Sequence, residues 1–465
     1  MTRIPLTHIG SGDENNPRVG QLFHDIDRNI IETYHDSAFS SVGTPEGYVN
    51  VKDFGAKGDG VTDDTEAIQA AIDANPKVFF PDGEYIIEDT IYLPRSFEFK
   101  GSLTGMTYAS SYAPESCMIS ARFGEEVTEM FKPKDFTDSK IRTHAIIRDI
   151  AFNGNEHTSQ LRTCFYGFNF RRTLIYNILI KHVGYAFRSS FSFVSVIRDS
   201  TFIGLTKSFI DTQNFIGSEY ILVDSFVSGN YINGRPFFTN VILFNGQIAH
   251  STISNNYIDF AYIGIYMRNG TTNANIIGNI IDVCYRGIYS NVTYNYSIIG
   301  NSFTNCHKNY LTSWTNNTLY EDSNLSDMST KDWCGFTSTG MRSITLSHNN
   351  FKLCNLAINL WDIYTNTINS KIIGNTYDNV DQKIKFRIYH DHLGRSHTGN
   401  IFIDDLMYQQ YTELPNSRTT ILSTDEPPTD RIVAFNNQII LLNGLPLINY
   451  DQKWYKFDGT EYTQE

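Results

Sequence analysis

The sequence predicts an all-β protein that folds as a parallel β-helix, a solenoid in which each coil takes about 22–26 residues. The composition favours strands, because the chain contains 28 Tyr and 32 Phe while only 19% of its residues are charged. A motif that begins with Asn recurs through the middle of the chain with a constant internal register. A leucine-rich repeat of similar period would require Leu at fixed positions, and this motif offers Ile, Asn and Tyr instead.

The motif predicts where each coil turns. Successive copies are separated by 23, 22, 48 and 26 residues, and they begin at Asn256, Asn279, Asn301, Asn349 and Asn375. Position two after each Asn is apolar or aromatic and position three is polar, which is the alternation of a strand with one buried face. Asn tolerates a left-handed turn, and its side chain can bond the equivalent Asn on the coils above and below. Weaker copies are expected upstream, around Asn177, Asp199 and Asp224.

Position five of the motif is a column of small apolar residues in which three of the six cysteines fall: Ala261, Cys284, Cys306, Cys354 and Val380. We expect these cysteines to be buried in the core at one corner of the coil. A disulfide or a metal role is the alternative, although no two cysteines have the Cys-x-x-Cys spacing of a zinc site. The sequence therefore predicts no cofactor and no required metal.

The segment Asp53–Ile72 places glycines before a helix and at first looks like a phosphate-binding loop. Asp63 and Asp64 stand where a phosphate would bind, and their charge argues against that function. We expect a helix over residues 63–74, with Asp63 as its N-cap and Glu66 completing a capping box. This helix would cover the exposed core of the first coil as an N-terminal cap.

The solenoid is expected over residues 47–408, with a further segment at each end. The N-terminal arm, residues 1–46, places Leu22, Ile26 and Ile30 at helical spacing, which suits a three-helix contact or a single helix lying on the body. The C-terminal segment, residues 409–465, contains strand and turn patterns such as KWYKFDGTEY. It is predicted to form a small β module that caps the solenoid or trimerises.

Net charge and hydropathy limit the classes of partner that the sequence predicts. The net charge of −13 argues against nucleic acid or an anionic membrane. No stretch of eighteen consecutive apolar residues occurs, so we expect no membrane insertion. The opening residues carry no basic end followed by an apolar run, and we expect no export signal.

The chain resembles the pectate-lyase-like superfamily of right-handed β-helix proteins in two stretches, VKDFGAKGDGVTDDTEAIQAAIDA and VFFPDGEYII. Coils marked by Asn continue this resemblance to about residue 390. The NTDG and GHG signatures of polygalacturonases are absent, so the chain most resembles a bacteriophage tailspike or capsular polysaccharide depolymerase. The resemblance implies a homotrimer on the virion that binds a phage tail or baseplate protein through its N-terminal arm. It also implies action at the bacterial cell surface on a polysaccharide, either capsule or O-antigen.

Two outward columns of the solenoid would suit a sugar polymer, because aromatic rings stack on pyranose rings and polar groups bind hydroxyl or acidic groups. One column is expected to run through Phe244, Tyr266, Tyr289 and Leu311, and the other through Arg268, Asn291, Ser313, Trp361 and Arg387. Ordinary exposed strand residues would give the same pattern. The 48 residues between Asn301 and Asn349 exceed one coil, which predicts a long loop at about residues 312–342 rather than a degenerate extra coil. This loop would carry Trp314 and Trp333.

Glycoside hydrolysis requires two carboxyl groups, about 5 Å apart for retention and further apart for inversion, one of them protonated. The candidates are loop acids, an acid beside Trp361, a single upstream acid and one stacked pair: Asp322, Asp327, Asp362, Asp211, Asp259 and Asp282. In the stacked pair, neighbouring coils would hold Asp259 and Asp282 at near-retaining separation and raise one pKa. The alternative is that position three is only a solvated surface.

Hydrolysis by paired carboxylates is the preferred prediction, and other classes stay open. A lyase would act by β-elimination on a uronate, for which His307, Lys308 and Tyr310 lie together before the long loop. A glycan-binding adhesin would use the same scaffold without turnover. A purely structural fibre segment is disfavoured by the acidic loop with its tryptophans.

Overall fold

The structure is a computed structural model, and it describes residues 3–5, 22–25, 30–35, 38–41, 44–102, 117–122, 124, 127–134, 142–155, 162–211, 220–234, 241–268, 270–306, 333–361, 370–387, 401–404, 421–424, 439–442, 445–450 and 453–456. The chain divides into two compact units, Met1–Ser189 with Ser195–Thr201 (unit 1) and Ser190–Val194 with Phe202–Glu465 (unit 2). Both units consist mainly of short parallel strands that pair with the strand one coil further along. This pairing confirms the predicted right-handed parallel β-helix.

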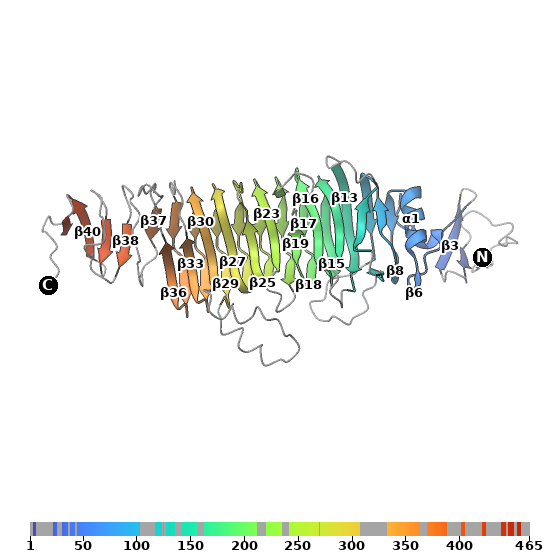
Figure 1. Cartoon of the computed structure of the whole chain (residues 1–465). Helices are drawn as coiled ribbons and strands as arrows, with labels where there is room; N and C mark the ends of the chain where they lie inside the picture. The colour runs from blue at the N-terminus through green and yellow to red at the C-terminus, as the bar shows by residue number, and fades with distance from the viewer. Residues whose placement is uncertain are drawn as a thin grey trace, which may run out of the picture. The chain divides into compact units, whose positions relative to one another are not determined.

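Unit 1 has a core of stacked aromatic rings. Phe131, Phe165 and Phe187 follow one another at ring-centroid distances of 5.0 and 5.4 Å. Figure 1 shows β13 and β15 of this unit side by side, as their register requires. The elements of unit 1 after the arm are β5 (Val49–Asn50), the 3-10 helix η1 (Val51–Phe54), β6 (Asp59–Asp63), α1 (Thr65–Ala74), β7 (Lys77–Phe79), β8 (Gly83–Ile87), β9 (Ile91–Leu93), β10 (Ser96–Lys100), β11 (Cys117–Ala121), β12 (Glu129–Pro133), β13 (Arg142–Asn153), β14 (Thr163–Arg171), β15 (Leu174–Lys181), β16 (Tyr185–Ser192), which extends into unit 2, and β17 (Val196–Arg198).

The N-terminal arm forms strands where a helix is predicted. The strands β1 (Arg3–Pro5), β2 (Leu22–Asp25), β3 (Ile30–His35) and β4 (Ala38–Ser41) pair in order as an antiparallel sheet. The helical prediction is wrong because β3 combines β-branched and aromatic residues, which favour strands over a weak helical spacing. Ile26 lies outside the described residues.

Helix α1 begins at Thr65, and its N-cap residue is Asp64 rather than the predicted Asp63. The Asp63 carboxylate accepts a hydrogen bond from Thr65 N at 3.0 Å. The Asp64 carboxylate instead accepts one from Gly58 N at 3.0 Å, so the chain's own charge occupies the N–H group that a phosphate would need. The exclusion of a phosphate-binding loop therefore agrees with the geometry. The helix buries Ile68, Ala71 and Ile72, and its role as an N-terminal cap stays a prediction.

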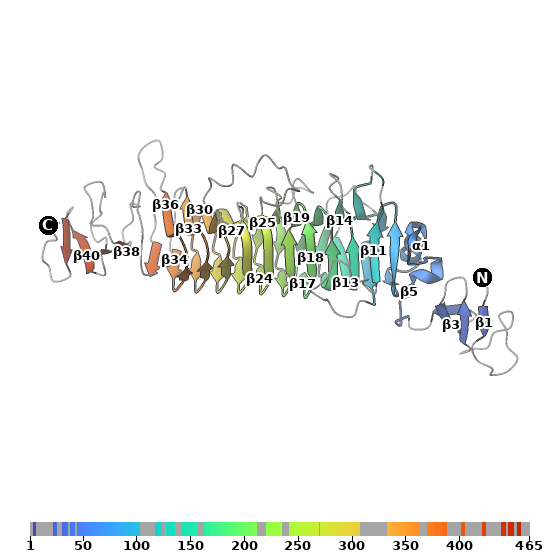
Figure 2. The same cartoon turned by 90° about the horizontal axis from the view of Figure 1, so that it is seen from below.

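Unit 2 is arranged as successive coils with several parallel faces. Figure 2 shows β24 and β34 along one side and β25, β27 and β30 along the other. Its strands are β18 (Thr201–Leu205), which begins in unit 1, β19 (Ser208–Asp211), β20 (Tyr220–Val223), β21 (Phe226–Ser228), β22 (Tyr231–Gly234), β23 (Ile242–Ala249), β24 (Thr252–Ser254), β25 (Tyr257–Met267), β26 (Asn275–Ile277), β27 (Ile280–Tyr294), β28 (Ser297–Ile299), β29 (Ser302–Thr304), β30 (Cys334–Arg342), β31 (Thr345–Ser347), β32 (Asn350–Lys352), β33 (Leu356–Trp361), β34 (Ser370–Ile373), β35 (Thr376–Asp378), β36 (Gln382–Arg387), β37 (Ile401–Asp404), β38 (Ile421–Thr424), β39 (Ile439–Leu442), β40 (Leu445–Tyr450) and β41 (Lys453–Lys456).

The predicted asparagine column is a continuous hydrogen-bonded ladder. Each side-chain amide donates to the Oδ1 atom of the next Asn at 2.9–3.0 Å, and the next Oδ1 atom also accepts from the backbone N–H group. All members are buried, so each amide satisfies polar groups that would otherwise be unpaired. The ladder also contains a member that the motif search missed, and it runs through Asn230, Asn256, Asn279, Asn301, Asn349 and Asn375.

The upstream copies are offset from the predicted positions. In unit 1 the ladder position is Ser200, whose hydroxyl accepts from Ile178 N at 3.3 Å, so Asn177 and Asp199 each stand one residue too early. Both have left-handed φ angles of 49° and 50°, which explains their likeness to turn asparagines. Asp224 belongs to a different turn, since the coil of unit 2 that contains it is marked by Asn230.

Positions two and five form the core, as predicted. Phe303, Phe351 and Tyr377 stack with ring centroids 4.7 and 5.6 Å apart. All six cysteines are free and buried, which confirms the core prediction for Cys284 and its equivalents. A disulfide is not formed among them.

The strands around the predicted loop define one coil with an insertion. The strand β29 pairs with β32, and β27 pairs with β30 so that Ile288 lies opposite Phe336. The coil that starts at Asn301 therefore resumes at Cys334, and residues 307–332 between them lie outside the described residues. The predicted loop end at residue 342 is too late, because residues 334–342 form β30.

The last strands follow the predicted strand and turn patterns. The strand β38 pairs with β39 in parallel, whereas β39, β40 and β41 pair antiparallel. A capping or trimerising role for this segment stays a prediction.

Candidate active site

Two carboxyl groups share one column of the solenoid. Asp259 of β25 and Asp282 of β27 are direct partners in the parallel pairing of successive coils. Neighbouring strands lie about 4.8 Å apart, so the two side chains leave the backbone one strand spacing from each other. Asn233 precedes Asp259 in this column and Thr304 follows Asp282. The predicted stacking of the two acids is confirmed, and their catalytic role stays a prediction.

The Asp282 carboxylate is surrounded by donors. Its Oδ1 atom accepts hydrogen bonds from Val283 N at 3.0 Å, Thr304 Oγ1 at 2.8 Å and Asn305 Nδ2 at 2.7 Å. Its Oδ2 atom accepts one from the Tyr257 hydroxyl at 2.9 Å. Val283 and Asn305 have left-handed φ angles of 45° and 54°, and this turn brings a backbone N–H and a side-chain amide to the carboxylate. Four donors hold this carboxylate in one orientation.

The Asp259 carboxyl group has the opposite environment. Its side chain is only 5% exposed, its Oδ2 atom accepts from Asn233 Nδ2 at 3.3 Å, and its buried Oδ1 atom has no well-formed hydrogen bond among the described residues. Burial, followed by the charge of Asp282, raises the pKa of Asp259 to about 7. This side chain is therefore not on the solvated surface that was the alternative for position three. Asp378, exposed at the end of the same column, does fit that alternative.

Tyr257 joins the two coils of the pair. Burial and the hydrogen bond to Asp282 raise the pKa of its hydroxyl above the ordinary value, so the phenol keeps its proton and acts as a donor. Its ring lies 5.4 Å from that of Tyr231, its partner on the preceding coil. The Tyr231 hydroxyl in turn accepts from Asn233 Nδ2 at 3.2 Å.

An aromatic cluster follows three residues further along each strand. Tyr262 and Tyr285 stack 4.9 Å apart at 13°, and Trp333 packs edge-on against Tyr285 at 5.7 Å. The Arg286 guanidinium lies over the Tyr285 ring at 5.4 Å and over the Tyr289 ring at 4.7 Å. Trp333, predicted in the long loop, therefore stands at the entry of β30 and closes this cluster.

A second group, the Tyr/Arg strip, occupies the outer face of the same strands. Tyr266 and Tyr289 are in-register partners whose rings stack 5.0 Å apart at 7°, and Arg268 lies over the Tyr266 ring at 5.6 Å. Each ring thus covers one face of the other, which leaves less ring face for a pyranose than predicted. The hydroxyls and the two guanidinium groups of Arg268 and Arg286 remain, and neither guanidinium pairs with a carboxylate in the part of the chain that the structure describes.

Asp211 and Asn291 belong to this strip. Asn245 Nδ2 donates to Asp211 Oδ2 at 3.3 Å, and Asn245 Oδ1 accepts from Arg268 Nε at 3.0 Å. Asn291 Nδ2 donates to the Tyr266 hydroxyl at 3.4 Å. The structure therefore brings Asp211 together with the predicted sugar-binding residues and not with the carboxyl pair.

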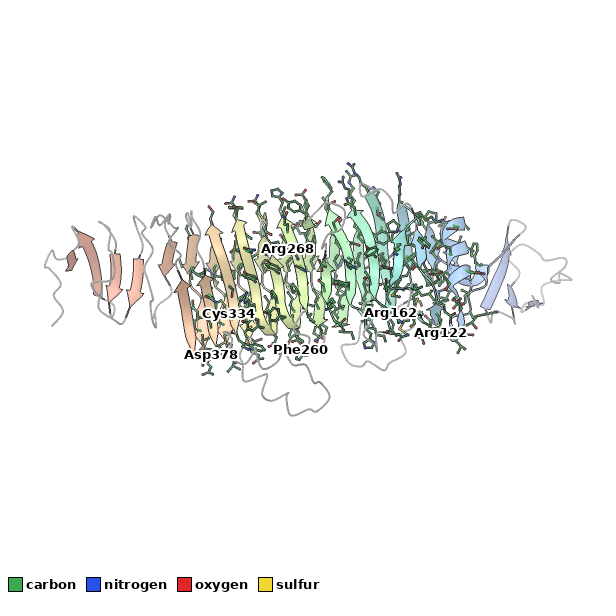
Figure 3. All side chains as sticks on the ribbon, viewed as in Figure 1. Arg122, Arg162, Phe260, Arg268, Cys334 and Asp378 are labelled. Carbon is green, nitrogen blue, oxygen red and sulfur yellow. The ribbon has the colours of Figure 1, made fainter. Side chains whose placement is uncertain are left out.

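The carboxyl pair and the Tyr/Arg strip are different places on the same strands. Tyr266 is seven residue steps after Asp259 on β25, which at 3.3 Å per step is at most about 23 Å. Phe260, with a left-handed φ of 50°, turns the chain between them. Figure 3 shows the labelled Phe260 at the lower edge of the strands and Arg268 well above it.

Several predicted positions require correction. Phe244 is an inward residue opposite Ile265, and Asn245 takes the outward place beside Tyr266. The partner of Tyr289 is Thr337, not Leu311, because the insertion after Cys306 shifts the count. Likewise Thr339, not Ser313, is the partner of Asn291. Trp361 pairs with Arg387 as predicted, while the following candidates lie outside the described residues: His307, Lys308, Tyr310, Trp314, Asp322, Asp327 and Asp362.

Residues that complete the carboxyl pair were missed by sequence reasoning. The signal was present in part, because Tyr257 is two residues before Asp259 and therefore on the same face of the strand. The missed residues are Asn233, Tyr257, Tyr262, Tyr285, Arg286, Thr304 and Asn305.

Among the described residues, no group of three or more His, Cys, Asp and Glu side chains is placed to hold a metal ion. In the same part of the chain, neither helix is long and apolar enough to cross a membrane.

The fold is that of a pectate-lyase-like β-helix protein. The sequence matches the rhamnogalacturonase A/epimerase, pectate lyase-like family over residues 48–381, and the chain belongs to that family. The A-module of the mannuronan C-5 epimerase AlgE6 of Azotobacter vinelandii shares the fold, with a TM-score of 0.54 and 18% identity over 82% of this chain and 100% of that one.

Short segments also match curated proteins. A probable glucan endo-1,3-beta-glucosidase of Arthroderma benhamiae is 44% identical over 69 residues, which are 14% of this chain and 8% of that protein. Alginate lyase 7 of Azotobacter vinelandii is 71% identical over 41 residues, 8% of this chain and 5% of that protein. The matched segments span less than a tenth of the length of either relative.

Proposed function

We propose that this chain is an endo-acting glycoside hydrolase that binds and cleaves a bacterial surface polysaccharide. The observation that carries the proposal is the pairing of a buried Asp259, with a pKa near 7, and a heavily hydrogen-bonded Asp282 on the next coil. Two carboxyl groups whose environments separate their proton affinities are the usual basis for assigning a general acid and an anionic partner. The glucosidase similarity supports hydrolysis as one activity within reach of this scaffold.

The pair would act by retention. Asp259 donates its proton to the glycosidic oxygen as the bond to the anomeric carbon breaks, and the Asp282 carboxylate bonds to that carbon. Asp259, now ionised, takes a proton from water, and the resulting hydroxide displaces Asp282. A separation of about 5 Å between carboxyl groups suits this double displacement, and one strand spacing is of that size.

β-Elimination by a polysaccharide lyase is the second candidate function, and the similarity to alginate lyase 7 supports it. A lyase needs a base that removes the proton beside the uronate carboxyl group. Tyr257 is the described phenol nearest the pair, and its raised pKa disfavours a phenolate base there. Hydrolysis is therefore the function that the described residues support better.

We propose a tailspike role from the order of the three segments along the chain. An antiparallel N-terminal sheet precedes the parallel coils, and three antiparallel strands follow them. We infer a homotrimer on a phage tail, attached through the N-terminal arm and facing the bacterial surface. Light scattering of the purified full chain tests the trimer, and a monomer would contradict it.

The activity is tested by incubating the full chain with a panel of capsular and O-antigen polysaccharides. Shorter oligosaccharides with new reducing ends and no unsaturated product would support hydrolysis. Ultraviolet absorbance from an unsaturated uronate would show a lyase instead. Binding without any shortening of the polymer would show an adhesin.

A further inference from the structure

Tyr257 is placed to control the more reactive oxygen of the pair. The Oδ1 atom of Asp282 already accepts three hydrogen bonds, whereas Oδ2 accepts only that of the Tyr257 hydroxyl at 2.9 Å. A carboxylate oxygen with one donor keeps a lone pair for a reacting carbon, and one with three does not. The single donor on Oδ2 therefore fixes the rotation of the carboxylate about its last bond.

The same strand supplies this donor and the opposite carboxyl group. Tyr257 and Asp259 stand two residues apart on β25, so both side chains leave the same face of the strand. Tyr257 reaches across to the next coil, while Asp259 stays buried with an Oδ1 atom that has no well-formed hydrogen bond in the part of the chain that the structure describes. The two carboxyl groups therefore differ in their hydrogen bonds. The Asp282 carboxylate accepts four, and the Asp259 carboxyl group accepts one from a side chain, that of Asn233.

We propose that Tyr257 is a positioning residue that fixes the rotation of the Asp282 carboxylate so that Oδ2 meets the substrate, and thereby assigns the acid role to Asp259. This inference rests on the proposed hydrolysis for its kinetic consequence only. The unequal distribution of hydrogen bonds between the two carboxyl groups is a property of the resting protein.

Among the described residues, the other titratable groups around the pair are the Tyr257 hydroxyl on β25, the Tyr231 hydroxyl on β22 and the Cys284 thiol on β27. Burial raises the pKa of the Cys284 thiol well above its ordinary value. Further along the column, two coils beyond Asp282, Lys352 pairs with Asp378 at 3.8 Å. Asp282 is accordingly the main charge that opposes ionisation of Asp259.

The chain offers a matched control for Tyr257. Tyr231 holds the same position one coil earlier, and its ring packs against that of Tyr257. Its hydroxyl accepts from Asn233, on the Asp259 side of the pair. Removing either hydroxyl deletes one atom from a half-buried tyrosine, so both variants have similar effects on packing.

The kinetic test compares Tyr257→Phe with Tyr231→Phe in the full chain. Tyr257→Phe should lower kcat about tenfold with little change in KM, because the Asp282 carboxylate is no longer held at one rotation. Tyr231→Phe should lower kcat less. Equal losses of kcat in both variants, or a rise in KM with kcat unchanged in Tyr257→Phe, would overturn the positioning role.

A second measurement needs no substrate. Carboxyl ¹³C NMR of the aspartate-labelled full chain, with Asp259→Asn and Asp282→Asn used to assign the two signals, follows each carboxyl group directly. The Asp282 signal should change its chemical shift in Tyr257→Phe and keep it in Tyr231→Phe, and an unchanged signal in Tyr257→Phe would refute the inference. If no polysaccharide is cleaved but the signal moves, hydrolysis is wrong and the positioning role stands. If a polysaccharide is cleaved but the signal does not move, the positioning role is wrong and hydrolysis stands.

Discussion

Asp259 and Asp282 are partners in one parallel strand pairing, yet the Asp282 carboxylate accepts four hydrogen bonds while one Asp259 oxygen has no well-formed hydrogen bond among the residues that the structure describes. Equivalent positions of a repeat thus carry the same residue in unequal environments. The difference comes from what stands before and after the pair in the column, Asn233 on one side and Thr304 on the other. A repeating backbone can therefore build an asymmetric site.

Removing either carboxyl group should abolish cleavage. We expect Asp259→Asn and Asp282→Asn each to lower kcat by a factor of about 10² or more, because one loses the proton donor and the other the anionic partner. Reducing-end assays on a cleaved polysaccharide measure this. Asp378→Asn is the matched control, since that residue lies exposed in the same column. Full activity in Asp282→Asn would remove the pair as the catalytic site.

Burial of Asp259 should make stability depend on pH. Its folded pKa of about 7 lies above the ordinary 3.8, so the folded chain holds a proton that the unfolded chain has released between those values. The free energy of unfolding should therefore fall as pH rises from about 4 to 7, by a few kcal/mol at about 1.4 kcal/mol per pKa unit. Asp259→Asn should flatten this decline, which melting curves across that range can show. Parallel curves for the two proteins would contradict the buried, protonated state.

The asparagine ladder should be essential for stability. Asn279 is fully buried, donates to Asn301 Oδ1 at 2.9 Å and accepts from Asn256 Nδ2 at 3.0 Å. Asn279→Ala removes the acceptor of Asn256 N and Nδ2 and the donor to the Ile253 carbonyl, and should lower the free energy of unfolding by about 2–4 kcal/mol. Asn350→Ala, at an exposed position, should change it by less than about 0.5 kcal/mol. Denaturant titration compares the two, and similar effects would mean that the ladder is not the source of the stability.

The Tyr/Arg strip should bind acidic groups of a polymer. Arg286→Gln removes a guanidinium that no described carboxylate neutralises, and we expect it to weaken binding of an acidic polysaccharide about fivefold or more at low salt. A neutral polysaccharide should be affected less. Arg198→Gln is a suitable control, because Arg198 also lies over a tyrosine, Tyr176, but pairs with Asp199. Equal losses for acidic and neutral polymers would argue against charge recognition.

The six thiols should be unreactive until the chain unfolds. All six cysteines are buried and free, and burial raises the pKa of the Cys164 and Cys284 thiols. A thiol-reactive chromophore should therefore label almost none of them in the native protein and all six after denaturation without reductant. Fewer than six labelled thiols would reveal a disulfide.

The repeat could be predicted from sequence because the coils from Asn230 to Asn375 each bury an Asn whose amide bonds the next Asn, so the same residue recurs at that position. The carboxyl pair was found by the same route, through its fixed offset from the ladder. The burial of Asp259 and the donors around Asp282 could not be predicted, since they depend on side chains that reach between coils.

Other errors came from counting along the chain. Leu311 was placed beside Tyr289 by assuming an uninterrupted coil, but the partner of Tyr289 is Thr337. In the arm, spacings of four residues from Leu22 to Ile26 to Ile30 fit a helix, and the antiparallel pairing of β2 with β3 overrides them.

The uninterrupted pairing of β27 with β30 across that insertion has an evolutionary consequence. Because β27 and β30 pair in register across the interval between Cys306 and Trp333, insertions and deletions in this interval can accumulate without changing the register of the coils on either side.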